Sequence, residues 1–177
     1  MGFQTTSFEM QPTMAQRVMF SACSNGKRDY LTFHVGAVGK HSGMLKMVNA
    51  GAGNLGGIGI TEDDTGISVQ SQRIDSLMDP QTPIMVMKVD IEGYEDKAPN
   101  GMAKIFENKL VQNIVMEFTP TVMGVERAAH MLEYLHSFGF TNITELDFME
   151  PSQYSKPLQI KPDNTTGPAW AREFQKI

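Results

Sequence analysis

Apolar and polar positions along the chain predict strands that alternate with helices. The clearest unit spans residues 85–120, where an apolar stretch ends at Asp90, a short acidic turn with one glycine follows, and a helical segment leads to a second apolar stretch that ends at Glu117. This order of strand, turn, helix and strand is typical of α/β folds. Because ligands of open α/β sheets bind at the carboxyl ends of the strands, two carboxylates at adjacent strand ends predict a site.

The rest of the pattern predicts further strands around this unit. The expected strands lie at residues 4–9, 30–35, 44–48, 67–72, 84–89, 113–118, 143–148 and 158–160. The last two are expected to form an antiparallel pair. Strands that alternate with helices predict a mostly parallel sheet with helices on both faces. No internal repeat is visible, and no second domain is expected.

The helices are predicted from apolar residues that recur at helical spacing. The first begins at Pro12, which suits the first turn of a helix, and ends before Asn25 and Gly26. The second follows the acidic turn and is expected to cover residues 102–110. The last covers residues 126–138, and the next residue is a glycine, which commonly ends a helix in the left-handed conformation.

The length of 177 residues is enough for one domain with a core of its own. We expect this domain at residues 1–161, followed by a polar tail at residues 162–177. The net charge is −5, from 15 basic and 20 acidic residues, and the basic residues do not form a long run. Strong, sequence-independent binding of nucleic acid is therefore not expected.

Disulfide, metal and membrane chemistry are not indicated. Cys23 is the single cysteine, which excludes an internal disulfide and a cysteine-rich zinc site. The four histidines lack metal-ligand spacing, so no metal is expected. No apolar run reaches the roughly 18–20 residues that span a bilayer, and no signal peptide is visible, so we expect a cytoplasmic protein without a membrane partner. The pattern specifies no oligomeric state.

Residues 51–56 spell the GxGxxG pattern of dinucleotide-binding loops. That pattern binds phosphates when the glycines follow a strand and open a helix. A strand is expected before this loop, but residues 57–66, GIGITEDDTG, contain more glycines and β-branched residues and do not favour a helix. We interpret the segment as a hairpin connection. A nucleotide-dependent oxidoreductase is kept as an alternative, and it requires a helix that begins near Gly57.

Three segments together resemble the FkbM-type methyltransferases, Rossmann-like enzymes that use S-adenosylmethionine. These segments are residues 7–9 (SFE) with Pro12, residues 36–39 (GAVG), and residues 88–95 (KVDIEGYE) with residues 114–118 (IVMEF). The third segment is the specific one. Residues 73–77, RIDSL, also look like the linker that precedes this strand in the family. The resemblance covers about residues 5–140 and implies a Rossmann-like sheet.

The resemblance also implies roles for residues at the strand ends. Glu9 would accept hydrogen bonds from the ribose hydroxyls of the cofactor, as acids at this position do in Rossmann-like folds. Ala37 and Val38 would flank the adenine. Asp90, which would also contact the cofactor, and Glu92 would lie where the methyl group meets the acceptor, and a carboxylate there could orient a hydroxyl or take its proton. The implied reaction is O-methylation of a small molecule or glycan. A helix cap is the structural alternative for Glu92.

The chain departs from the family in one respect. Family members have an earlier strand with a glycine-rich turn that holds the methionine end of the cofactor, whereas this chain starts at the following strand. Without a central strand the sheet would have an unpaired groove with exposed backbone groups. We therefore expect either an N-terminally truncated fragment of a longer protein or a chain that has lost catalysis. The alternative function is a non-catalytic binding or scaffold domain derived from a methyltransferase.

Overall fold

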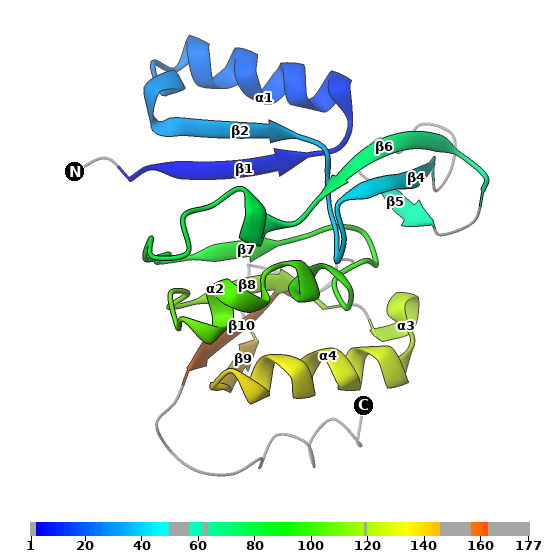
Figure 1. Ribbon diagram of the computed structural model, residues 1–177, viewed down its shortest axis with the longest axis vertical. Helices are drawn as coiled ribbons and strands as arrows, with labels where there is room; N and C mark the ends of the chain where they lie inside the picture. Colours follow the sequence, from blue (N-terminus) through cyan, green and yellow to red (C-terminus); the bar gives the residue numbers. More distant parts are fainter. Residues whose placement is uncertain (1–2, 50–56, 62–63, 119, 146–156, 163–177) are drawn as a thin grey trace.

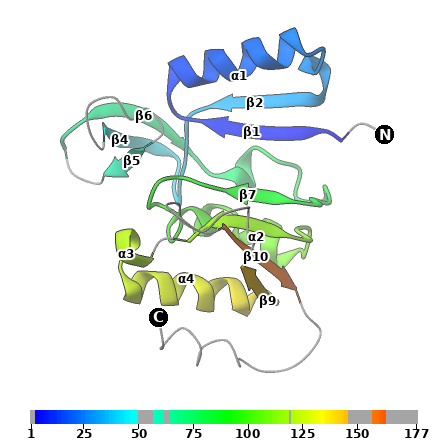
Figure 2. The same ribbon diagram turned by 180° about the vertical axis from the view of Figure 1, so that it is seen from behind.

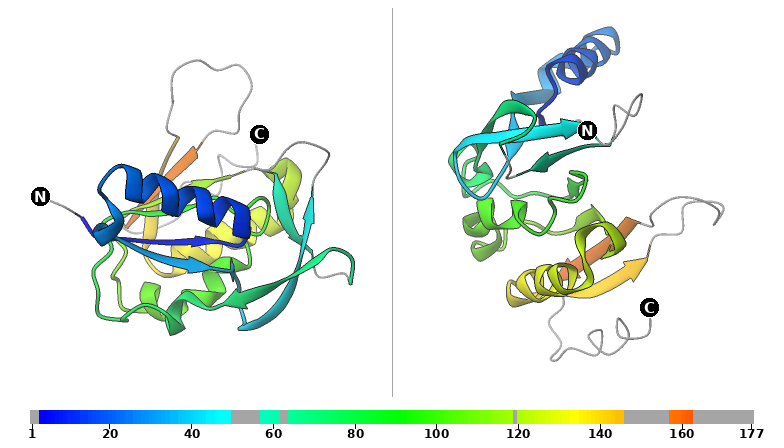
Figure 3. Two further views of the ribbon diagram at one scale, coloured as in Figure 1. Left: turned by 90° about the horizontal axis from the view of Figure 1, so that it is seen from above. Right: turned by 90° about the vertical axis from the view of Figure 1, so that its right-hand side faces the viewer.

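The computed structural model describes residues 3–49, 57–61, 64–118, 120–145 and 157–162. Within these residues the strands form three separate sheets, with helices at both ends of the molecule (Figure 1). Helix α1 (Pro12–Ser24) lies at one end and α4 (Val125–Ser137) at the other, as Figures 1 and 3 show. The sheets therefore occupy the middle of the molecule.

The first sheet is the parallel pair β1 (Thr5–Glu9) and β2 (Leu31–Val35), joined by α1 and the short helix η1 (Arg28–Tyr30). The helix starts at a proline and stops where the sequence predicts, since Gly26 follows it in the left-handed conformation with φ of 62°. It runs back along β1 and β2 (Figures 1 and 3). This arrangement brings the start of α1 and the end of β2 to the same side.

The second sheet has the strand order β3-β6-β4-β5. Its strands are β3 (Ala37–Val38), β4 (Gly43–Asn49), β5 (Ile58–Thr61) and β6 (Ile67–Gln72). A small core of its own is formed by Ala37, Met47, Ile58 and Val69. Strand β5 pairs antiparallel with β4 in the segment where the dinucleotide interpretation requires a helix. The oxidoreductase alternative is therefore wrong, although residues 51–56 themselves lie outside the described residues.

The third sheet has the order β7-β8-β10-β9. Its strands are β7 (Met87–Val89), β8 (Ile114–Glu117), β9 (Phe140–Glu145) and β10 (Pro157–Pro162). Strands β7 and β8 are parallel, and β10 is antiparallel to both of its neighbours, which confirms the predicted antiparallel pair at the end of the chain. The remaining helices are η2 (Ile74–Ser76), η3 (Ala98–Gly101), α2 (Ala103–Glu107) and α3 (Pro120–Met123).

The main core lies around β7, β8 and α4. Its largest fully buried apolar side chains are Ile105, Ile114, Met116, Met131 and Leu135. The buried residues of α4 share one face of the helix at the spacing that predicts an amphipathic helix. Side chains of this size each contribute about 1.5–3 kcal/mol when buried, so this cluster is the main source of apolar stabilisation for the strand ends above it.

The predicted single, mostly parallel sheet is not confirmed. Among the described residues three strand pairs are parallel and four are antiparallel. The reason lies in the connections, because short links between neighbouring strands permit antiparallel pairing, whereas parallel pairing needs a longer crossover. Strands β4 and β5 are joined by such a short link and form a hairpin, and β6 then pairs antiparallel with the other edge of β4.

Strands β1 and β7 each have one edge without a ladder partner in the described part of the chain. Among the described residues, β1 pairs with β2 alone and β7 with β8 alone, and the two strands belong to different sheets. In Figures 1 and 2, β2, β1, β7 and β8 follow one another down the molecule, so the open edges of β1 and β7 are next to each other in this order. Their backbone groups lack ladder partners there. The unpaired edges expected from the sequence are therefore present.

The end of the chain is described only in part. Strand β10 reaches Pro162, and residues 163–177 lie outside the described residues, so the division into a domain at 1–161 and a tail at 162–177 stays a prediction. None of the helices in the described part of the chain has the length and apolar character needed to cross a bilayer.

Amide hydrogen exchange should distinguish the open edges from the central strand. We expect protection to alternate along Thr5–Glu9, because only the amides that face β2 have ladder partners, and to be continuous along Ile114–Glu117 between β7 and β10. Exchange followed by NMR measures this residue by residue. Uniform protection along β1 would show that its second edge is paired in solution, contrary to this description.

Candidate functional site

Three carboxylates meet at the ends of β7 and β8. Asp90, Glu92 and Glu117 each place one carboxylate oxygen within 4.8 Å of the others. The cause is the parallel register, which sets Val89 opposite Met116, so that the next residue of each strand is an acid. The two acids at adjacent strand ends that the sequence predicts are therefore together. Glu117 belongs to the cluster although the resemblance gives it no role, and its place at the end of an apolar strand was the signal for it.

The charges in this cluster affect one another. Lys88 pairs with Asp90, with 2.5 Å between Nζ and Oδ2. Partial desolvation raises the pKa of Glu92, and the neighbouring carboxylates of Glu117 and Asp90 raise it further. Carboxylates held close together resist simultaneous ionisation. Glu92 therefore keeps its proton to a higher pH than an isolated glutamate, which suits a group that exchanges a proton with a substrate.

The turn that carries Glu92 has an unusual backbone. Glu92 and Gly93 both have positive φ, of 54° and 89°. Inside the turn, Glu95 is 1% exposed, and its Oε1 accepts a hydrogen bond from the backbone N–H of Ile91 at 2.9 Å. Burial raises the pKa of Glu95. This carboxylate closes the turn from within and acts as a structural group. Glu92 does not cap a helix, because the next helical segment begins only at Ala98.

Glu9 lies at the carboxyl end of β1, where the chain turns into α1. Its Oε1 accepts a hydrogen bond from the backbone N–H of Gln11 at 2.7 Å, and its carbonyl oxygen accepts one from the N–H of Gly36 at 2.9 Å. A carboxylate can accept about four hydrogen bonds, so this side chain has capacity for hydroxyl donors as well. The bond to Gly36 fixes Glu9 beside the segment that leads into β3.

Ala37 and Val38 form β3, which pairs with Ser71 and Gln72 of β6. Ala37 is 5% exposed and belongs to the small core, whereas Val38 is partly buried against the main core. Met10, the residue after Glu9, also packs on the small core. A flexible thioether next to Glu9 is a further apolar group for a ring to lie against. Sequence analysis missed it, and its position directly after the acid was the available signal.

The predicted residues thus form two groups. Glu9 is linked through Gly36 to Ala37 and Val38, whereas Asp90 and Glu92 gather with Glu117. The helices that follow β1 and β8 begin on the same side of the molecule, so both groups lie at the carboxyl ends of their strands on that side (Figure 1). This is the edge where open α/β sheets bind ligands.

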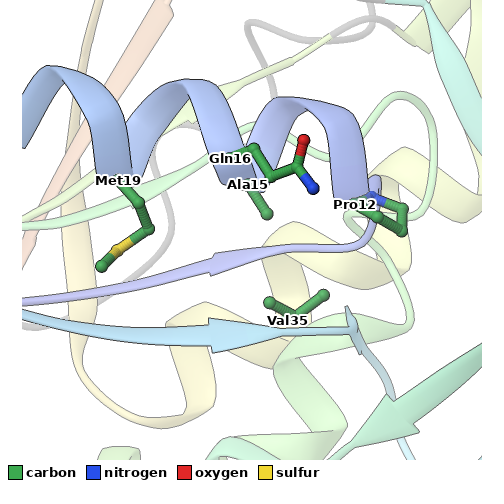
Figure 4. A pocket seen from close by; sticks show the side chains of 5 residues that line it. All are labelled: Pro12, Ala15, Gln16, Met19 and Val35. Carbon is green, nitrogen blue, oxygen red and sulfur yellow. The ribbon is translucent and has the colours of Figure 1, made fainter.

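An open apolar groove lies between α1 and the end of β2. It has a volume of about 370 Å³ and is lined by Pro12, Ala15, Gln16, Met19 and Val35 (Figure 4). Val35 is opposite Glu9 in the β1–β2 register, so the groove adjoins this acid. None of the lining side chains is ionisable, and the groove therefore offers an apolar surface without acid–base chemistry.

The carboxylate cluster also has the oxygen ligands that Mg²⁺ and Ca²⁺ prefer. Three carboxylates supply half of the six ligands that such ions take, and exposed acidic groups are common in proteins without a metal. The described residues supply no further His, Cys, Asp or Glu ligand at this cluster. We assign no metal here, and the absence of a metal stays a prediction.

Comparisons with known proteins agree with this description. A model of the methyltransferase FkbM domain matches residues 3–141. The solved structure of methyltransferase FkbM from Methylobacillus flagellatus KT has the same fold, with a TM-score of 0.61 and 17% sequence identity. The similarity covers 89% of this chain but 36% of that protein, so the chain spans about a third of its length. Among curated proteins none matches. Because the family model covers most of the residues, and the strand ends that carry the acids lie within it, the chain belongs to the FkbM methyltransferase domain family.

Proposed function

We propose that the chain forms part of an S-adenosylmethionine-dependent methyltransferase that methylates a hydroxyl group on a small molecule or glycan. The observation that carries the proposal is the cluster of Asp90, Glu92 and Glu117 at the ends of two parallel strands. Membership of the family supports methyl transfer, and the clustered carboxylates favour an acceptor that must lose a proton. A hydroxyl fits that requirement.

The adenosine half of the cofactor fits the first group of residues. Glu9 would accept hydrogen bonds from the ribose hydroxyls with the capacity that Gln11 leaves, and Val38 and Met10 offer apolar surface for the adenine. Ala37 would contribute its backbone and small size, since its side chain is buried. When bound, S-adenosylmethionine supplies an already activated methyl group. The protein then has to position the acceptor and take its proton.

The carboxylate cluster would position the acceptor and take its proton. Asp90 is held by Lys88 and would orient the acceptor hydroxyl through a hydrogen bond. Glu92 would take the proton, because its raised pKa makes it a stronger base than an ordinary glutamate. Glu117 would keep this pKa high through its negative charge. Each role follows from charge and proximity in the cluster.

A non-catalytic binding domain is the second candidate. The observation in its favour is the pair of open edges on β1 and β7. Such a domain would keep the fold without turnover. Calorimetric titration of the folded chain with S-adenosylhomocysteine separates the two, since micromolar binding supports the methyltransferase and no binding supports the alternative.

Replacing Glu9 tests the ribose contact. We expect Glu9→Ala to weaken S-adenosylhomocysteine binding by about 1–3 kcal/mol, the scale of a hydrogen bond to a charged group. Calorimetry measures the affinity, and Glu133→Ala, which removes an exposed acid on α4, is the matched control. An affinity equal to that of the unmodified chain would mean that the ribose is held elsewhere.

Replacing Asp90 tests the role of the carboxylate cluster. We expect Asp90→Ala to abolish methyl transfer while the fold and the affinity for S-adenosylhomocysteine change little, because this half-exposed side chain is not part of the core. Transfer of a labelled methyl group to a panel of hydroxyl acceptors measures turnover, and circular dichroism checks the fold. Undiminished turnover would remove Asp90 from the mechanism.

The pH dependence tests Glu92. A base must be deprotonated to act, so the rate of methyl transfer should rise as the pH rises through the pKa of Glu92, which lies above the usual range for glutamate. We expect Glu92→Gln to lower the rate and to remove this rise. Initial rates over the acidic to neutral range measure both effects. A profile that keeps its shape in the variant would assign the proton transfer to another group.

A further inference from the structure

The acidic turn needs support from outside, because its backbone is strained. Glu92 is a non-glycine residue with φ of 54°, and Gly93 continues the left-handed conformation with φ of 89°. Such conformations persist only where the surrounding structure holds them. Inside the turn, the Glu95 carboxylate accepts hydrogen bonds from the backbone N–H groups of Ile91 and Gly93. Groups outside the turn must therefore help to hold Glu92 beside Asp90 and Glu117.

Arg127 of α4 makes that contact. Its Nε donates to Oδ2 of Asp96 at 2.8 Å, and its Nη2 donates to Oδ1 at 2.5 Å, which forms a bidentate pair. The same Nη2 donates to the carbonyl oxygen of Gly93 at 3.5 Å. One guanidinium therefore touches the turn at its left-handed glycine and again at its end. This geometry is specific to arginine, whose planar fork matches a carboxylate.

The turn also comes close to β5. A Cβ atom added to Gly59 would lie 3.0 Å from the carbonyl oxygen of Glu92, so the two backbones are in close approach there. The turn thus contacts both the backbone of β5 and the guanidinium of Arg127. Gly59 contributes a close backbone approach, whereas Arg127 contributes directional hydrogen bonds.

Arg127 lies in the first turn of α4, where a positive charge is unfavourable to the helix dipole. Its side chain is 46% exposed and that of Asp96 is 13% exposed, so solvent weakens the pair as a source of stability. The Arg127–Asp96 pair therefore adds little to the stability of the helix or of the fold. Its main effect is on the position of the acidic turn.

We propose that Arg127 is a positioning residue, which holds the acidic turn through Asp96 and Gly93 so that Glu92 stays in the carboxylate cluster with Asp90 and Glu117. The proposal rests on the proposed function in one respect, namely that methyl transfer takes place at this carboxylate cluster. Arg127 itself touches neither cofactor nor acceptor in this role.

Amide hydrogen exchange tests, without any ligand, whether Arg127 holds the acidic turn. We expect Arg127→Ala to speed exchange of the Ile91 and Gly93 amides about tenfold, within the range for coupled neighbours, and Asp96→Ala to do the same. The double variant should not exceed Arg127→Ala, since Arg127→Ala already removes the contacts with both Asp96 and Gly93. Arg127→Lys should not restore protection, because an ammonium cannot form the fork. Arg17→Ala, an exposed arginine on α1, is the matched control and should leave the turn unchanged.

The titration of Glu92 gives a readout that a simple surface ion pair would not produce. Removing a positive charge would by itself raise the pKa of a nearby carboxyl or leave it unchanged. If Arg127 positions the turn, Glu92 moves away from Glu117 and Asp90 in Arg127→Ala, and its pKa falls toward the ordinary value. NMR titration of the side chain measures the direction. A fall supports the proposal, whereas no change or a rise overturns it.

Activity completes the test. We expect Arg127→Ala to lower kcat about tenfold while the affinity for S-adenosylhomocysteine changes less than about twofold, because Glu9 holds the cofactor from another sheet. If the unmodified chain binds no S-adenosylhomocysteine, the proposed function fails, and the exchange and titration results still decide the role of Arg127. Should Arg127→Ala not fold, Asp96→Asn removes the fork more gently. Unchanged turn protection in folded Asp96→Asn and Arg127→Lys would overturn the proposal.

Discussion

The parallel pairing of β7 with β8 is the contact on which the rest of the structure depends. Its register sets Val89 opposite Met116, and both side chains are buried in the main core. A shift by one residue would turn these apolar side chains out of the core, so the register is fixed. Asp90 and Glu117 come next along each strand. The spacing of the carboxylates is therefore a consequence of how the core packs beneath them.

The two groups of site residues belong to different sheets. Glu9 ends β1 and the carboxylate cluster ends β7 and β8, and no strand among the described residues pairs with both β1 and β7. What connects them is side-chain packing, because Phe8 and Val38 lie against the main core. Packing fixes relative positions less sharply than a continuous hydrogen-bonded ladder. The solved methyltransferase of the same fold is longer, since the similarity covers 89% of this chain but 36% of that protein.

Much of the fold follows from local pattern. The helices α1 and α4 begin and end close to the residues that the sequence predicts, because Pro12, Gly26 and Gly139 have strong local preferences. The helix expected at 102–110 is shorter, since Lys109 has φ of 53° and ends it early. Strand β5 was missed because its four residues lie among glycines and gain their conformation from pairing with β4.

The sequence by itself determined the order of the elements, the family resemblance, and the acids at the ends of β1, β7 and β8. These features depend on hydrophobic periodicity and on residues next to each other in the chain. The tertiary structure alone decided that the sheet is divided, that Ala37 is buried, and that Arg127 contacts a turn more than thirty residues earlier. Such contacts arise when distant segments pack together, and their partners leave no periodic signal in the sequence. The carboxylate cluster needed both, because the sequence supplied the acids and the register of two strands brought them together.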